Sequence, residues 1–330
     1  MTFKAEWEKA NDSHILAANV VENMAAIACP GKNLISQEMI SGGCANLNIK
    51  IQLEGDLEPL LLRVYLRDKD AAWREKSIAT LLQSTVRVPV PVPQVLRICD
   101  YENYRFAITE FIPGITLRDL LLSDEPHDVG TVMRQVGTIL ARIAAHKFPA
   151  AGFFDKNLHV INQLIPDDYL KHAKQSLQNN IVSIQLGADA IAKINVTLDK
   201  YAHLFPSGKE KQLVHADFDP ANILVAKIEN DWQITGILDW EFSFSGSALY
   251  DIANMLRYKH QTSAIFEQAF LNGLTQSGIN LPENWTIIVD ILNLVSLLDC
   301  LTRSDPEKMP KRCADINLLS YNIIQRLSQE

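Results

Sequence analysis

The spacing of apolar residues changes once along this 330-residue chain, near Pro113-Gly114, and this change constrains the fold more than any other feature. Between about residues 35 and 110 the apolar segments are short, and Ile49–Leu53 alternates with the period of a strand. After Pro113-Gly114, apolar residues mostly recur every three or four positions, as in helices that face a core. The pattern predicts a two-lobed α+β chain, with a small β-rich lobe over residues 1–113 and a larger, mainly helical lobe over 114–330.

Residue spacing also predicts the individual elements. A helix over residues 70–83 interrupts the strands, and the proline-rich run at 88–93 ends it because proline has no amide donor. Strands at 223–228 and 232–238 flank a turn and predict a hairpin within the helical half. Helices are expected at 115–122, 127–147, 167–205, 247–258, 261–276, 284–302 and 312–327.

Charge and cysteine content exclude several classes of protein. The chain has 31 Lys and Arg against 39 Asp and Glu, a net charge of −8 that argues against a dedicated nucleic-acid binder. Its 5 cysteines form no CxxC pair, which disfavours a structural zinc site or disulfide framework and predicts a cytoplasmic protein. Polar residues interrupt the apolar stretch 285–301, so we expect a core helix there and no membrane association.

The most specific pattern lies around the predicted hairpin. Asp217, in His215-Ala216-Asp217, precedes Asn222 by five positions, and Asp239 ends the second strand of the hairpin. Phosphoryl transfer needs an acceptor hydroxyl held in line and Mg²⁺ to bridge the phosphates. An aspartate in a short loop can orient the hydroxyl and accept its proton. An asparagine carbonyl and a second carboxylate provide the oxygen ligands that Mg²⁺ prefers, and the hairpin would bring Asn222 and Asp239 together.

Three segments, in order along the chain, resemble the aminoglycoside phosphotransferase and choline kinase-like family, which has a protein-kinase-like fold. LVHADFDPANILV (213–225) resembles its catalytic loop, and ILDWEFSFSGSALYDIANML (237–256) resembles its metal-binding aspartate and the helix that follows. SGGCANLNIKI (41–51) resembles the turn that covers the nucleotide phosphates. The resemblance implies a small-molecule kinase that transfers the γ-phosphoryl group of ATP or GTP, with Mg²⁺, to a hydroxyl of a small substrate.

The resemblance also implies a role for each matching residue. Asp217 would be the catalytic aspartate, Asn222 and Asp239 would bind magnesium, and His215 and Asp251 would support the catalytic loop. The residues expected to bind the nucleotide, or to hold those that do, come from the small lobe and the hinge: Gly42, Gly43, Arg63 in place of the family's lysine, its ion-pair partner Glu75, Thr109, Glu110 and Phe111.

Several alternatives stay open at the level of sequence. The acceptor could be an aminoglycoside or, in a metabolic kinase, choline, homoserine or a sugar, and a catalytically silent nucleotide-binding scaffold is the rival outside the enzymes. A protein substrate is less expected, because no DFG or APE triplet follows the catalytic loop. Glu241 could face the substrate, cap a helix or remain solvated, while Asp219-Pro220 is expected to form only a turn. The choice of nucleotide and the oligomeric state are not specified.

Overall fold

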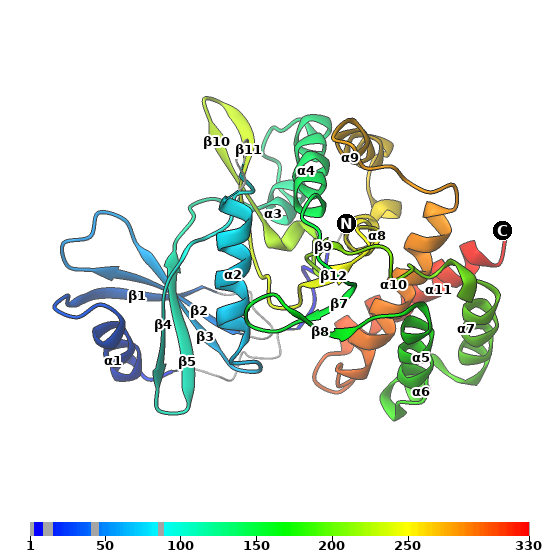
Figure 1. The fold of residues 1–330 in the computed structure, drawn as a ribbon, viewed down its shortest axis with the longest axis horizontal. Coiled ribbons are helices and arrows are strands. Elements are labelled where there is room, and N and C mark those ends of the chain that lie inside the picture. Colours follow the sequence, from blue (N-terminus) through cyan, green and yellow to red (C-terminus); the bar gives the residue numbers. More distant parts are fainter. Residues whose placement is uncertain (1–2, 9–15, 41–45, 85–88, 330) are drawn as a thin grey trace.

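The computed structural model describes residues 3–8, 16–40, 46–84 and 89–329, and it has two lobes (Figure 1). The N-terminal lobe is an antiparallel sheet in the order β1-β2-β3-β5-β4. Its strands are β1 (Leu34–Ile40), β2 (Asn46–Leu53), β3 (Leu60–Tyr65), β4 (Val95–Tyr101) and β5 (Tyr104–Glu110). The strand-rich first third and the helix predicted at 70–83, which is α2 (Ala71–Gln83), are confirmed.

A helix that the spacing of apolar residues did not predict covers one side of this sheet. It is α1 (Ala18–Ala28), which buries Val21, Met24, Ala25 and Ala28 against the inward residues of β2 and β3. On α2, the buried Ala71 and Ala72 pack with Tyr65 and Ala107 of the sheet. The same helix presents Glu75 toward β3, so the sheet and α2 together fix the position of one expected site residue.

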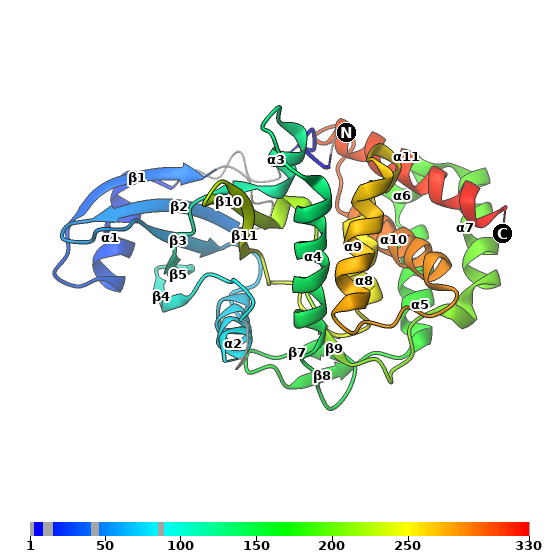
Figure 2. The same ribbon diagram turned by 90° about the horizontal axis from the view of Figure 1, so that it is seen from above.

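The C-terminal lobe is mainly helical, and most of its core is one continuous apolar cluster. Its helices are α3 (Leu117–Leu122), α4 (Val129–Ala144), α5 (Pro166–Leu177), α6 (Asn180–Leu186), α7 (Ala188–Lys200), α8 (Leu249–Leu256), α9 (Ala264–Gln276), α10 (Trp285–Thr302) and α11 (Pro310–Leu327). Helices α4 and α9 lie side by side (Figure 2) and touch through glycines. A Cβ on Gly137 would lie 2.1 Å from the carbonyl oxygen of Phe270, so only glycine permits this approach.

The single helix expected at 167–205 is wrong, because the segment forms three helices. The Asn179 side chain accepts a hydrogen bond from the Ile181 amide and starts α6, and Gly187, with φ +76, separates α6 from α7. Two strands that the sequence did not indicate, β7 (Gly152–Phe154) and β8 (Val160–Gln163), join β9 (Gln212–Val214) and β12 (Phe244–Gly246) in a small sheet. Local turn chemistry and these short strands were not readable from apolar periodicity.

The predicted hairpin is confirmed as β10 (Ile223–Ile228) and β11 (Asp231–Ile237). Its turn residues Glu229 and Asn230 have φ +51 and +75, the left-handed values that a tight hairpin turn requires. Strand β10 also pairs with β6 (Ile115–Thr116), which directly follows the hinge. The hairpin therefore holds the catalytic-loop region against the point where the chain enters the second lobe.

Among the described helices taken singly, α10 alone is long and apolar enough to cross a membrane. More than half of its most apolar stretch is buried inside the protein, and it contacts α5, α8 and α11. A buried core helix satisfies the same length and composition test. The structure thus gives α10 the core position that was expected for residues 285–301.

The first described residues lie against the helical lobe, far from the sheet that follows them in sequence. Phe3 is 2% exposed and contacts the rings of Tyr258 and Phe266, at centroid distances of 5.7 and 6.0 Å. Figure 2 shows the first described residues, in dark blue, near α11, whereas α1 lies at the left end of the molecule. The division into lobes at residue 113 remains a prediction, but residues 3–8 contact the other lobe.

Candidate active site

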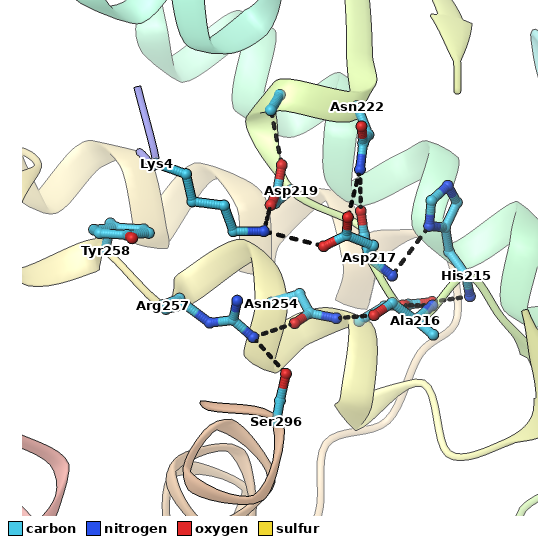
Figure 3. A network of polar contacts seen from close by, with 12 residues as sticks. Lys4, His215, Ala216, Asp217, Asp219, Asn222, Asn254, Arg257, Tyr258 and Ser296 are labelled. Atoms are coloured by element: carbon cyan, nitrogen blue, oxygen red, sulfur yellow. Dashed lines mark hydrogen bonds and ion pairs between the residues drawn. The ribbon is translucent and has the colours of Figure 1, made fainter. Parts of the chain in front are cut away.

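The expected catalytic loop follows β9 and is held by α8 (Figure 3). The Asp251 carboxylate is buried and accepts hydrogen bonds from the backbone amides of His215 and Ala216, both at 2.8 Å. One turn later, the Asn254 side chain donates to the Ala216 carbonyl at 2.9 Å. Ala216 has φ +73, a strained value for a residue with a Cβ, and these bonds maintain it. The side chains of α8 thus hold the backbone directly before Asp217.

His215 connects the loop to the strand that carries Asp239. Its Nε2 lies 2.8 Å from the Leu238 carbonyl, and its Nδ1 accepts from the Asp217 amide at 3.2 Å, so the bonds select the neutral tautomer. Burial lowers the pKa of His215, against the opposing charge of Asp217, and the centroid of the ring lies 4.4 Å from that of Trp240 at a tilt of 54°. This is the bracing position that the resemblance implied, and a neutral buried ring suits it.

Asp217 and Asn222 are in direct contact. The Asn222 amide nitrogen donates to the Asp217 carbonyl and to one carboxylate oxygen, both at 2.9 Å. These bonds turn the Asn222 carbonyl oxygen away from Asp217. Asp219 caps the short turn between them by accepting from the Ala221 amide at 2.8 Å, as expected for a turn former.

Asp239 reaches the same place through the hairpin. The Leu238 amide donates to the Asn222 carbonyl at 2.8 Å, so the chain positions of Asn222 and Asp239 are adjacent across β10 and β11. Asp239 has φ +67, and its side chain bonds to Arg63 of β3. The side-chain oxygen of Asn222, Oδ1, and the second Asp239 oxygen suit Mg²⁺, which takes oxygen ligands and commonly completes its shell with phosphates and water. Among the described residues, no three His, Cys, Asp or Glu side chains converge on a metal site.

Arg63 is buried between two carboxylates. It forms the expected ion pair with Glu75 at 3.1 Å, and Tyr65 donates to the other Glu75 oxygen at 2.6 Å. Burial would lower the pKa of Arg63, but Glu75 and Asp239 outweigh it and the pKa rises, so the guanidinium stays charged. Burial is also the main cause of the raised pKa of Glu75. Arg63 therefore couples α2 and the sheet to the expected metal ligand.

Glu241 forms a second connection between the lobes. It is 6% exposed, accepts from the Asn46 side chain of β2 at 3.0 Å, and its carbonyl accepts from Arg74 of α2 at 2.9 Å. Burial, and then the neighbouring charge of Asp239, raises the pKa of Glu241 to about 7. Of the three roles left open for Glu241, a solvated surface position is excluded. The side chain lines the cavity described below.

The residues expected at the nucleotide base and phosphates are only partly placed. Gly42 and Gly43 lie outside the described residues. In the hinge, the Glu110 amide already donates to the Gln94 carbonyl at 3.0 Å, and Thr109 is buried. Phe111 lies under the Lys50 ammonium, 4.8 Å from the ring centroid. The Glu110 amide is thus occupied within the sheet and does not face a ligand.

The expected catalytic and metal residues share a cavity of about 820 Å³. Asp217, Asn222 and Asp239 line it together with residues of α5, α10 and the N-terminal segment. Lys4 is the site residue that sequence reasoning missed. Its ammonium is 3.0 Å from Asp217 and also bonds to Asp219 (Figure 3). No local signal marks this lysine, because 213 residues separate it from its partner.

Known proteins share this architecture. A model of the "Phosphotransferase enzyme family" matches residues 36–284. The curated hygromycin-B 4-O-kinase of Escherichia coli is 25% identical over 190 residues, and the chain spans about half the length of that relative. A crystal structure of spectinomycin phosphotransferase with ADP and spectinomycin superposes with a TM-score of 0.63 at 16% identity, covering 96% of this chain and 100% of that one.

A microcompartment-associated aminopropanol kinase superposes with a TM-score of 0.65 at 13% identity, covering 94% of this chain and 96% of that one. At such identities the solved structures establish the fold, a kinase-like two-lobed α+β arrangement with an N-terminal antiparallel sheet and a helical C-terminal region. The family match covers well over half of the chain and includes every residue placed above except Lys4. The chain belongs to the phosphotransferase enzyme family.

Proposed function

We propose that this protein transfers the γ-phosphoryl group of ATP or GTP, with Mg²⁺, to a hydroxyl of a small metabolite or antibiotic. The observation that carries the proposal is the cavity of about 820 Å³ that brings Asp217, Asn222 and Asp239 to one wall. A volume of that order suits a small molecule and not a folded protein segment. Relatives whose structures contain ADP, ATP and small-molecule substrates support the same reading.

The roles of the side chains follow from their contacts. Asp217 accepts a hydrogen bond from the acceptor hydroxyl and orients its oxygen toward the γ-phosphorus, and Asn222 fixes the carboxylate in that orientation. Asn222 and Asp239 would hold Mg²⁺, which neutralises phosphate charge when bound. Arg63, charged and held by Glu75, can donate to nucleotide phosphate oxygens from the small lobe.

Charge in the cavity bears on the acceptor. Among the described residues, seven Lys and Arg side chains line it: Lys4, Arg67, Arg118, Lys171, Arg257, Arg303 and Arg312. Six acidic ones do so: Asp168, Asp217, Asp219, Asp239, Glu241 and Asp299. A polycationic aminoglycoside gains most from a strongly acidic pocket, which this is not. The balance favours an acceptor with few charges, such as an amino alcohol, a hydroxy acid or a sugar.

The test is direct phosphorylation of a panel. Purified protein is incubated with MgATP or MgGTP and with amino alcohols, homoserine, sugars, spectinomycin and hygromycin B, and products are read by mass spectrometry. We expect a product 80 Da heavier, by one phosphoryl group in place of a proton, from a small acceptor of low charge. Asp217→Asn should lower turnover by at least ~10²-fold, the scale of losing a positioned base, with the thermal unfolding midpoint little changed. Unchanged turnover in this variant would contradict the assignment of Asp217.

A further inference from the structure

The N-terminal segment Phe3–Glu8 is attached to the helical lobe by specific contacts along its length. Phe3 is buried between two rings of that lobe, and the Trp7 indole donates to Asp315 at 2.7 Å. The Trp7 ring also lies 4.9 Å from the Arg312 guanidinium. Aromatic anchors of this kind immobilise a segment at low entropic cost. The segment is therefore built into the lobe.

The end of the segment is attached to α11. The Glu8 carboxylate accepts from the backbone amides of Lys311 and Arg312, at 2.9 and 3.1 Å, where the first turn of a helix leaves its amides without partners. These amide bonds lower the pKa of Glu8, although burial opposes them. Glu6 adds an exposed ion pair with Lys311 at 3.0 Å. Both ends of the six residues are thus fixed, and the position of Lys4 between them is determined.

The backbone at Lys4 is strained. Phe3 and Lys4 have φ +40 and +62, in the left-handed region that residues with a Cβ seldom adopt. Two such residues in succession persist where surrounding contacts impose them. From this backbone the Lys4 side chain reaches the cavity that Asp217 also lines.

Lys4 brings a permanent positive charge to the expected catalytic carboxylate. Its ammonium lies 3.0 Å from one Asp217 oxygen and bonds to Asp219, while Asn222 occupies the other Asp217 oxygen. Burial alone would lower the pKa of Lys4, but Asp217 and Asp219 together raise it. The Lys4 ammonium and the Asp217 carboxylate thus form an ion pair within the cavity.

An ammonium carries three N–H donors, and two of them meet Asp217 and Asp219. A hydroxyl held by Asp217 approaches the γ-phosphorus at about 3–3.5 Å, which places the transferring phosphoryl group beside this ammonium. We infer that Lys4 is a catalytic residue, a cation supplied by the N-terminal segment that donates its remaining N–H to an oxygen of the transferring phosphoryl group while it orients Asp217. The inference rests on the proposed transfer from ATP or GTP.

The reaction balances without a proton from Lys4. The acceptor oxygen forms its bond to the γ-phosphorus as the bond from that phosphorus to the β,γ-bridging oxygen breaks, and the nucleoside diphosphate leaves with the electron pair. The hydroxyl proton passes to the Asp217 carboxylate. Lys4 remains protonated and stabilises negative charge on the phosphoryl oxygens, as fixed cations do in such transition states.

The first test needs no acceptor. Isothermal titration with Mg²⁺ compares the affinities of wild type and Lys4→Met for ADP and for AMP-PNP, which retains a γ-phosphoryl group. We expect Lys4→Met to lose ~10-fold or more in affinity for AMP-PNP, about 1.4 kcal/mol, with the affinity for ADP unchanged. Lys4→Arg should recover most of the loss, because it restores a donor cation. Lys311→Ala is the matched control, since it removes a contact of the same segment away from Asp217.

The second test uses whichever acceptor the panel identifies, or water if nucleotide hydrolysis is the sole activity. We expect Lys4→Met to lower kcat by ~10²-fold, the scale of removing one positioned donor, with the acceptor KM changed less. Added methylammonium should raise the rate of Lys4→Ala, and a rescue of that kind requires a missing cation and not a disrupted fold. Thermal unfolding of each variant shows whether the chain remains folded.

The outcomes separate the two proposals. Equal loss of ADP and AMP-PNP affinity, or full turnover in Lys4→Met, would overturn the role of Lys4 and leave the kinase function intact. Faster turnover in Lys4→Met, or after deletion of residues 1–8, would identify the segment as a plug of the acceptor site. If no acceptor is phosphorylated but the AMP-PNP preference is present and depends on Lys4, the proposed acceptor class fails and the role of Lys4 stands.

Discussion

Replacing Asp251 by asparagine should disrupt the catalytic loop more than any other conservative change. The native carboxylate accepts two backbone amides at 2.8 Å, from His215 and Ala216, and it is completely buried. An asparagine keeps one acceptor oxygen and turns an NH₂ group toward the other amide. One hydrogen bond, worth about 1 kcal/mol net, is lost, and a buried donor left unsatisfied costs about 1–3 kcal/mol more. We expect the free energy of unfolding to fall by about 2–4 kcal/mol.

The measurement is denaturant unfolding of Asp251→Asn beside Asp231→Asn, which changes an exposed aspartate at the start of β11 and serves as the control. The control should lie within about 0.5 kcal/mol of wild type. Hydrogen exchange should show lower protection at the amide of His215 or of Ala216. Because Asp217 follows directly, kcat should also fall by at least ~10-fold through misplacement of the carboxylate. Wild-type stability with unchanged exchange at both amides would refute the reasoning.

Three further outcomes follow from other parts of the structure. Gly114→Ala should destabilise the protein by about 2 kcal/mol or more, seen as a lower urea midpoint, because φ is +143 and a Cβ would lie 2.6 Å from the Val225 carbonyl oxygen. Gly137→Ala should likewise lower the midpoint, by forcing α4 away from α9, and unaltered stability would contradict the close packing. The hydrogen bond to Asp299 raises the pKa of His172, although partial burial opposes the shift. This bond therefore stabilises the folded protein fully at pH values below the pKa of His172 in the unfolded chain. The stabilisation disappears as the pH rises through the pKa of His172 in the folded protein. Asp299→Asn should therefore lower the pKa of His172, which an NMR titration of its ring protons would detect.

The hairpin and the catalytic loop were predictable because their signals are local. Asp217 and Asn222 are five residues apart, and their contact needs only one short turn. The hairpin needs left-handed residues at its turn, and Glu229-Asn230 adopts them. The prediction of one helix over 167–205 was wrong for the opposite reason. The spacing of apolar residues continues across Asn179 and Gly187, whereas the helical backbone is interrupted at both residues.

The sequence by itself determined the strands of the small lobe, the β10–β11 hairpin, most helices of the large lobe and the grouping of Asp217, Asn222 and Asp239. It did so because periodicity and turn chemistry act between near neighbours in the chain. The tertiary structure alone decided that Lys4 meets Asp217, 213 residues away, and that Asn46 meets Glu241, 195 residues away. Contacts of that range depend on how the two lobes and the N-terminal segment pack, and an isolated lysine near the N-terminus has no sequence signature of a catalytic cation.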